Sequence, residues 1–96
     1  MATNPNKANV AENADWQVYI LECADSSLYT GIARDLNSRL EVHNAGDGAK
    51  YTRARLPVKL IYSEGHPDRS SASQREAAIK RLPRAAKLAL IAANPD

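Results

Sequence analysis

Cysteine is nearly absent from this chain. Cys23 stands alone among 96 residues, so the protein cannot form an internal disulfide, and one thiolate cannot build a zinc cluster. His66 also has no partner at a metal-ligand spacing, and we interpret both residues as incidental to function. The sequence likewise lacks any stretch that resembles a signal peptide or a membrane span. These absences predict a cytoplasmic protein in a reducing setting, with no membrane contact.

The chain is too short for more than one small domain, because 96 residues cannot bury two cores. Residues 1–14 are rich in Asn and Ala and show no repeating period, so we expect a disordered N-terminal tail. The predicted domain covers residues 15–93, and residues 94–96 form a short C-terminal tail.

Acidic residues are missing from one long stretch. Between Gly48 and Ser63 there are four basic residues and no Asp or Glu. Residues 34–96 contain twelve basic residues against seven acids, whereas residues 1–33 contain one lysine against four acids. This segregation suits a polyanion such as nucleic acid, although a solvated surface with scattered Lys and Arg would have the same composition. Charge alone does not separate the two interpretations.

Apolar runs separated by a polar turn predict an antiparallel hairpin. Residues 16–23 (WQVYILEC) and 28–32 are rich in aromatic and β-branched residues, and residues 24–27 form the turn. A third strand is predicted at 58–63.

Alternation along the first strand places Val18 and Ile20 on one face and Tyr19 and Leu21 on the other. Both faces are therefore apolar, and we expect both to be covered. The hairpin also brings the phenols of Tyr19 and Tyr29 into one neighbourhood.

The first helix is predicted from an N-cap at Asp35 to about His43, with Leu36 and Leu40 buried and Arg39 on the same face as His43. The stretch 46–53 reads as a loop.

Ser71 and Gln74 form a capping-box pattern that opens a second helix ending near Leu82. Pro83 starts a third, whose polar face shows Arg84 and Lys87. Its apolar positions are expected to pack inward: Leu88, Leu90 and Ile91. The whole is an α+β domain in the order strand, strand, helix, strand, helix, helix, with a small three-stranded antiparallel sheet flanked by helices.

Two triplets stand at the tyrosines, Gln17-Val18-Tyr19 and Tyr29-Thr30-Gly31, and Arg39, His43 and Glu76 follow. In this order and register the chain resembles the GIY-YIG nuclease superfamily, and more closely its small single-domain bacterial subgroup, from residue 16 to residue 91. Gln17 and Thr30 depart from the glycine and isoleucine of the family triplets but leave both phenols in place.

The resemblance implies a catalytic set of Tyr19, Tyr29, Arg39, His43 and Glu76 for phosphodiester hydrolysis. Glu76 would hold a single divalent cation, Mg²⁺ or Mn²⁺, since a hard carboxylate oxygen suits such an ion. Arg39 would bind the phosphate through its planar fork, for which lysine is a poor substitute. Tyr19 would act as general base or orient the water, with Tyr29 beside it. His43 would accept the phenolic proton or contact phosphate; the sequence leaves both roles open.

Each of these residues also has a purely structural explanation. Tyr19 and Tyr29 could form a cross-strand pair that stabilises the hairpin. Arg39 could be an exposed helical arginine, and His43 could complement the helix dipole. Glu76 could pair with a lysine four residues on.

A further group of residues is predicted to contact the nucleic-acid backbone. Gly31 would allow close approach of the substrate, or simply end a strand. Tyr51 would stack on a base, or pack within its loop. The remaining members are basic: Lys50, Arg53, Arg55, Lys80, Arg84 and Lys87.

The resemblance thus implies a metal-dependent DNA endonuclease, for which we expect low sequence specificity, a preference for single-stranded or branched DNA and a role in DNA repair. Two alternatives remain open. The domain could bind nucleic acid without cutting it, or it could be a nuclease subunit that needs an unidentified protein partner.

Overall fold

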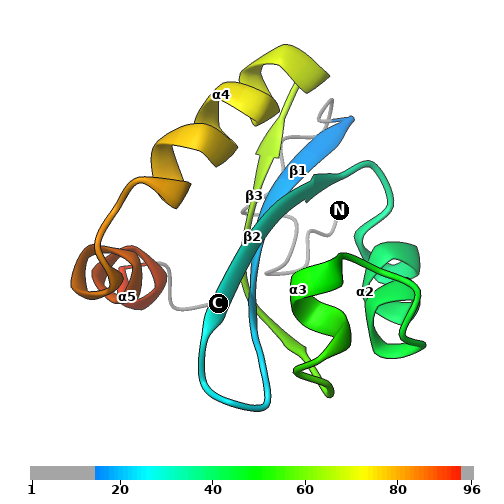
Figure 1. Cartoon of the computed structure of the whole chain (residues 1–96). Coiled ribbons are helices and arrows are strands. Elements are labelled where there is room, and N and C mark those ends of the chain that lie inside the picture. Colours follow the sequence, from blue (N-terminus) through cyan, green and yellow to red (C-terminus); the bar gives the residue numbers. More distant parts are fainter. Residues whose placement is uncertain (1–14, 94–96) are drawn as a thin grey trace, which may run out of the picture.

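The computed structural model describes residues 15–93 and shows a three-stranded antiparallel sheet between two layers of helices (Figure 1). The strands are β1 (Trp16–Glu22), β2 (Leu28–Ala33) and β3 (Lys59–His66), in the order β2-β1-β3. The predicted α+β class, the three-stranded antiparallel sheet and the predicted order of elements along the chain are confirmed. The two predicted tails lie outside the described residues.

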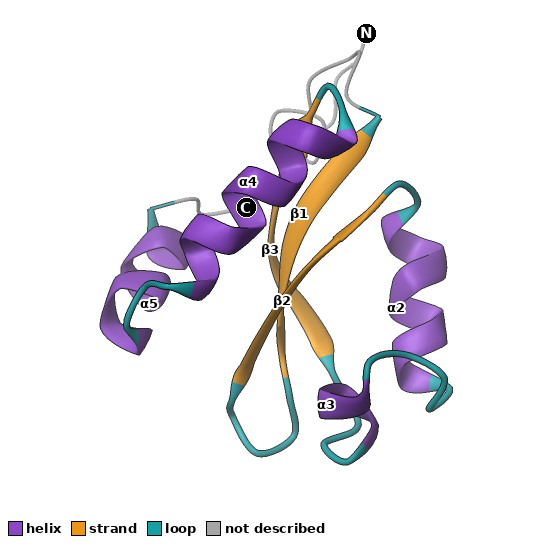
Figure 2. Cartoon of the chain, turned by 45° about the horizontal axis from the view of Figure 1, so that its top comes forward, coloured by secondary structure: helices purple, strands orange, loops and turns teal. Residues whose placement is uncertain are grey.

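Helices cover both faces of the sheet. Helices α2 (Leu36–Asn44) and α3 (Lys50–Arg53) lie on one side, and α4 (Arg69–Lys80) and α5 (Arg84–Ala92) lie on the other (Figures 1 and 2). No helix within residues 15–93 is long and apolar enough to cross a membrane.

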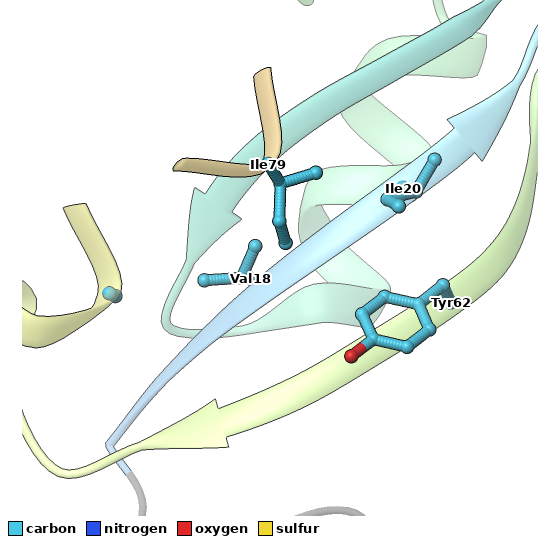
Figure 3. Packing of buried hydrophobic residues seen from close by; sticks show 5 residues of the cluster. Val18, Ile20, Tyr62 and Ile79 are labelled. Carbon is cyan, nitrogen blue, oxygen red and sulfur yellow. The ribbon is translucent and has the colours of Figure 1, made fainter. Parts of the chain in front are cut away.

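The predicted alternation along β1 is confirmed. Val18 and Ile20 are fully buried on the face that α4 covers, where Ile79 of that helix packs against them (Figure 3). Tyr19 and Leu21 are buried in a separate cluster on the opposite face. Central strand β1 therefore supplies the core of both layers, which explains why its sequence is apolar in almost every position.

Helix α2 is fixed at both ends by side-chain hydrogen bonds. Asp35 caps its first turn as predicted, with Oδ1 accepting from the Ser38 backbone N–H at 3.1 Å. At its last residue, Asn44 accepts from the Val58 N–H at 2.9 Å and donates to the Val58 carbonyl at 3.1 Å. These two hydrogen bonds anchor the end of the helix to the chain just before β3.

The predicted start of α4 was wrong by about one turn. The helix begins at Arg69, and the cap is Asp68, whose Oδ1 accepts from the Ser71 N–H at 2.8 Å. A carboxylate near the N-terminus benefits from the helix dipole as well as the hydrogen bond, so Asp68 is the stronger cap.

Two other predictions about helical segments were wrong. Residues 50–53, predicted as part of a loop, form the single helical turn α3. Leu88, predicted to pack inward, is 43% exposed, whereas Leu90 and Ile91 do pack on the core as expected.

Glu64 joins β3 to α4. Its carboxylate accepts hydrogen bonds from the Tyr62 hydroxyl (2.5 Å), His66 Nε2 (2.7 Å) and Arg75 Nε (2.9 Å). Burial alone would raise the pKa of Glu64, but these three donors outweigh it and hold the pKa below its usual range. The network therefore ties β3 to α4, the helix that also carries Glu76.

We predict that Ile79→Ala destabilises the domain strongly. Ile79 is fully buried between α4 and the sheet, and truncation at such a site costs about 2–5 kcal/mol through lost burial and the cavity left behind. Chemical denaturation measures the loss. Gln74→Ala, at an exposed position of the same helix, is the matched control and should change stability by no more than about 0.5 kcal/mol. Equal effects of the two substitutions would contradict this account of the core.

Candidate active site

The phenol of Tyr19 lies across the neighbouring strand. Tyr19 stands opposite Gly31, and a Cβ atom on Gly31 would lie 2.6 Å from the Tyr19 hydroxyl oxygen. No side chain fits there, so glycine is required for the phenol to adopt this position. We expected Gly31 to admit substrate or to end a strand, but the structure gives another reason for it.

His43 is the polar partner of Tyr19. Both side chains are 2% exposed, and His43 Nε2 lies 3.0 Å from the Tyr19 hydroxyl oxygen, within hydrogen-bonding distance. A histidine that only complemented the dipole of α2 would remain in solvent. Its burial against Tyr19 instead makes one hydrogen-bonded unit from residues that are 24 positions apart.

Two residues that the sequence reasoning missed hold His43 in place. Thr52 of α3 is fully buried, and its Oγ1 lies 2.9 Å from His43 Nδ1. Gly48 lies against the imidazole so closely that an added Cβ would clash with Nδ1 and would lie 2.9 Å from the His43 Cα. The pattern Gly-Ala-Lys-Tyr-Thr is a visible signal, but nothing in its local spacing shows that it folds onto a histidine.

Aromatic rings continue from His43 towards the surface. Tyr29 lies edge-on to His43 with ring centroids 5.4 Å apart, and it lies 6.4 Å from Tyr19, as expected for neighbouring phenols. Tyr51 stacks on Tyr29 at 6.3 Å, and the Arg55 guanidinium lies 3.8 Å from the centre of the Tyr51 ring. Tyr51 is 39% exposed, so packing against these neighbours leaves part of the ring in solvent.

Arg39 and Glu76 act on this buried unit from different helices. Arg39 is exposed on α2, one turn before His43, and its positive charge lowers the pKa of both Tyr19 and His43. Glu76, on α4 of the opposite layer, adds negative charge that raises the pKa of Tyr19. Tyr19, Tyr29 and His43 are therefore in contact, and the charges of Arg39 and Glu76 reach Tyr19 from helices on opposite faces of the sheet.

The buried pair is held neutral. Burial, with the neighbouring phenol of Tyr29 next in weight, raises the pKa of Tyr19 well above its ordinary value, despite the opposing charge of Arg39. Burial also lowers the pKa of His43, and the charge of Arg39 lowers it further. At neutral pH the phenol keeps its proton and the imidazole has a free lone pair, which is the pairing needed for proton transfer between them.

Glu76 is the candidate metal ligand. Its side chain is 22% exposed, and Oε2 lies 3.1 Å from Lys80 Nζ, so the structural pairing that we considered is present. Residues 15–93 contain no group of three or more His, Cys, Asp or Glu that could hold a metal. A lone accessible carboxylate fits a hard cation such as Mg²⁺, which keeps several waters and takes further oxygen ligands from phosphate. It does not fit a transition metal that needs a protein cage.

The predicted DNA-contacting cations do not form one patch. Lys50 and Arg53 are exposed on α3, whereas Arg84 and Lys87 belong to α5 on the opposite side of the sheet (Figure 2). Lys80 pairs with the candidate metal ligand, as described above.

Arg55 is also engaged within the protein. Its Nε donates to Asp25 at 3.1 Å and its Nη1 donates to the Tyr51 carbonyl at 2.8 Å. These bonds tie the β1–β2 turn to α3 and make Arg55 a support for the site.

Comparisons with known proteins agree with this arrangement. A family model described as the GIY-YIG catalytic domain matches residues 15–89. The UPF0213 protein of Streptococcus sanguinis is 57% identical over 74 residues, which cover 77% of this chain and 85% of that protein. The UPF0213 protein XAC3202 of Xanthomonas axonopodis pv. citri is 51% identical over 80 residues, covering 83% and 78%.

Two solved structures are similar as well. The solution structure of the UPF0213 protein BH0048 from Bacillus halodurans has a TM-score of 0.53 and 42% identity, covering 80% of this chain and 82% of that one. The solution structure of EF2693 from E. faecalis has a TM-score of 0.56 and 34% identity, covering 92% and 93%. The two triplets, the site that they build and these matches lead to one conclusion: the chain belongs to the GIY-YIG family, together with the small UPF0213 proteins.

Proposed function

We propose that this domain is a metal-dependent endonuclease that hydrolyses phosphodiester bonds in DNA with low sequence specificity. The observation that supports this most directly is the buried Tyr19–His43 pair, with the charges of Arg39 and Glu76 beside it. An aromatic pair that only stabilised a hairpin would need neither a buried histidine nor two opposite charges from separate layers.

Proton transfer in this proposal begins at the phenol. Tyr19 accepts a proton from the attacking water as its own hydroxyl proton passes to His43 Nε2, so no phenolate forms in these apolar surroundings. The new P–O bond forms as the bond to the 3′ oxygen breaks, and this oxygen takes a proton from solvent, which leaves a 5′ phosphate and a 3′ hydroxyl. Tyr29 borders the same space and limits the directions from which water can approach.

Charge on the phosphate is balanced from two sides. Arg39 offers two parallel N–H donors to the non-bridging oxygens, where negative charge builds up in the transition state. A divalent cation held by Glu76 would supply positive charge next to the departing 3′ oxygen. Lys80, with its side chain 52% exposed, is free to leave Glu76 and contact the phosphate backbone.

The DNA surface in this proposal lies on both sides of the sheet. Exposed cations on α3 and on α5 would contact the backbone without reading base sequence. A surface with two separated basic groups suits DNA that changes direction, which favours branched or single-stranded substrates over a straight duplex.

Activity is predicted to depend on a divalent cation and on Glu76. Labelled single-stranded, duplex and flapped DNA should be cleaved with Mg²⁺ or Mn²⁺, and cleavage should be lost with EDTA and in Glu76→Ala. Glu41→Ala removes an exposed carboxylate from α2 and should retain activity. Mn²⁺ binding, measured by paramagnetic broadening of NMR signals, should be lost in Glu76→Ala and retained in Glu41→Ala.

Absence of cleavage by the wild type, with salt-sensitive DNA binding, would favour a binding module. Cleavage that appears only after a cellular partner is added would favour the partner-dependent subunit.

The hydroxyl of Tyr19 is predicted to be essential for cleavage. Tyr19→Phe keeps the ring over the β2 strand but removes the group that relays the proton, so the rate should fall by about 10²-fold or more. Tyr62→Phe is the matched control, because it removes another buried phenolic hydroxyl on the opposite face. Circular dichroism should show both variants folded, and a fully active Tyr19→Phe would exclude the phenol from the chemistry.

The pH dependence should show the lowered pKa of His43. His43 must be neutral to accept a proton, so activity rises with pH through its pKa, and the lowered pKa places the acid limb of kcat/KM below the ordinary histidine value of about 6.5. Bound phosphate offsets the charge of Arg39, so the acid limb of kcat should lie at higher pH than that of kcat/KM. A kcat/KM limb clearly above 6.5 would assign the proton acceptor to another group.

A further inference from the structure

We propose that Thr52 is a positioning residue that fixes the tautomer of His43 and thereby sets the direction of proton transfer from Tyr19. This inference rests on the proposed function for its catalytic consequence, but the tautomer itself can be measured without any activity. It assigns a role to α3, the helical turn that the sequence did not predict.

The hydrogen bonds of Thr52 have a fixed order. Its Oγ1 lies 2.9 Å from the Ala49 carbonyl oxygen and 2.9 Å from His43 Nδ1. A carbonyl oxygen can only accept, so the single hydroxyl hydrogen of Thr52 is directed to Ala49. The Thr52 oxygen must then accept from His43, which places the imidazole hydrogen on Nδ1.

The other side of the ring gives the same answer. In neutral His43 with hydrogen on Nδ1, Nε2 has a lone pair and accepts from the Tyr19 hydroxyl at 3.0 Å. Within residues 15–93, His43 is the one hydrogen-bond partner of that hydroxyl. The opposite tautomer would leave the phenolic hydrogen without an acceptor at His43. It would also leave the Thr52 and Ala49 oxygens 2.9 Å apart with no hydrogen between them.

The local backbone is built to deliver this hydroxyl. Gly48 has no Cβ and so lets the chain pass against the ring of His43, just before α3 begins. The Ala24 N–H then donates to the Arg55 carbonyl at 2.9 Å, which holds the end of the turn to the β hairpin. Thr52 is fully buried between these attachments.

The tautomer decides whether the pair can relay a proton. With hydrogen on Nδ1, His43 can take the phenolic proton on Nε2 as Tyr19 takes one from water. With hydrogen on Nε2, the same 3.0 Å contact persists, but Tyr19 becomes the acceptor and His43 has no free lone pair facing it. Loss of the Thr52 hydroxyl should therefore reduce kcat without reducing substrate binding.

The test combines nitrogen NMR with kinetics on the full chain. Histidine labelled with ¹⁵N in the ring reports which nitrogen carries hydrogen, and His66 serves as the internal reference signal. Wild type and Thr52→Ser should both show His43 protonated on Nδ1. Thr52→Val, which replaces the hydroxyl by a methyl group of similar size, should shift His43 towards the Nε2–H form and lower kcat by about 10²-fold with KM unchanged. Thr30→Val, which removes the hydroxyl of another buried threonine, should change neither the His43 tautomer nor kcat.

An Nε2–H tautomer in the wild type would overturn the proposal even if no variant folded. So would Thr52→Val with an unchanged tautomer and full kcat. If the wild type shows the Nδ1–H form but cuts no DNA in any metal, the tautomer assignment stands and the proposed nuclease function fails.

Discussion

The phenolic hydrogen of Tyr19 needs an acceptor in a place that water barely reaches, and the local structure follows from that need. An unpaired buried hydroxyl costs about 1–3 kcal/mol, so the fold must supply a partner. His43 does so, and its own second nitrogen then requires Thr52. Two glycines provide the space for these side chains: Gly31 lies against the ring of Tyr19, and Gly48 lies against the ring of His43. Five positions from four segments thus form one interdependent unit.

The position of β2 at the edge of the sheet explains how two layers can serve one site. Arg39 and His43 come from α2 on one face, whereas Glu76 comes from α4 on the other (Figure 1). Because no side chain projects from Gly31, the Tyr19 phenol lies over the edge strand β2, where the charges of Arg39 and Glu76 both affect it. Packing of Ile79 and the ion pair between Arg75 and Glu64 hold α4, the helix that carries Glu76, against the sheet.

Sequence patterns predicted the parts that depend on local spacing. Alternation in β1 predicted the two faces and the polar turn predicted the hairpin, while the resemblance pointed to Tyr19, Tyr29 and His43, which the fold brings into contact. Helix α3 was missed because a four-residue turn after two glycines has little propensity of its own, and it is held by tertiary bonds through Thr52 and Arg55. The metal, the substrate and the DNA contacts remain predictions, since they depend on molecules outside the chain.

The pair between Glu76 and Lys80 shows how a structural and a functional interpretation can both hold. An i,i+4 pair on a helix contributes only about 0.3–0.5 kcal/mol, and here the lysine side chain is 52% exposed. So weak a contact cannot compete with a divalent cation for the carboxylate or with a phosphate for the lysine. In the free protein it pairs the Glu76 carboxylate, whose negative charge raises the pKa of Tyr19, with a positive charge. In the proposed mechanism Lys80 leaves when the carboxylate is needed for the metal, and its charge would then be available to the DNA.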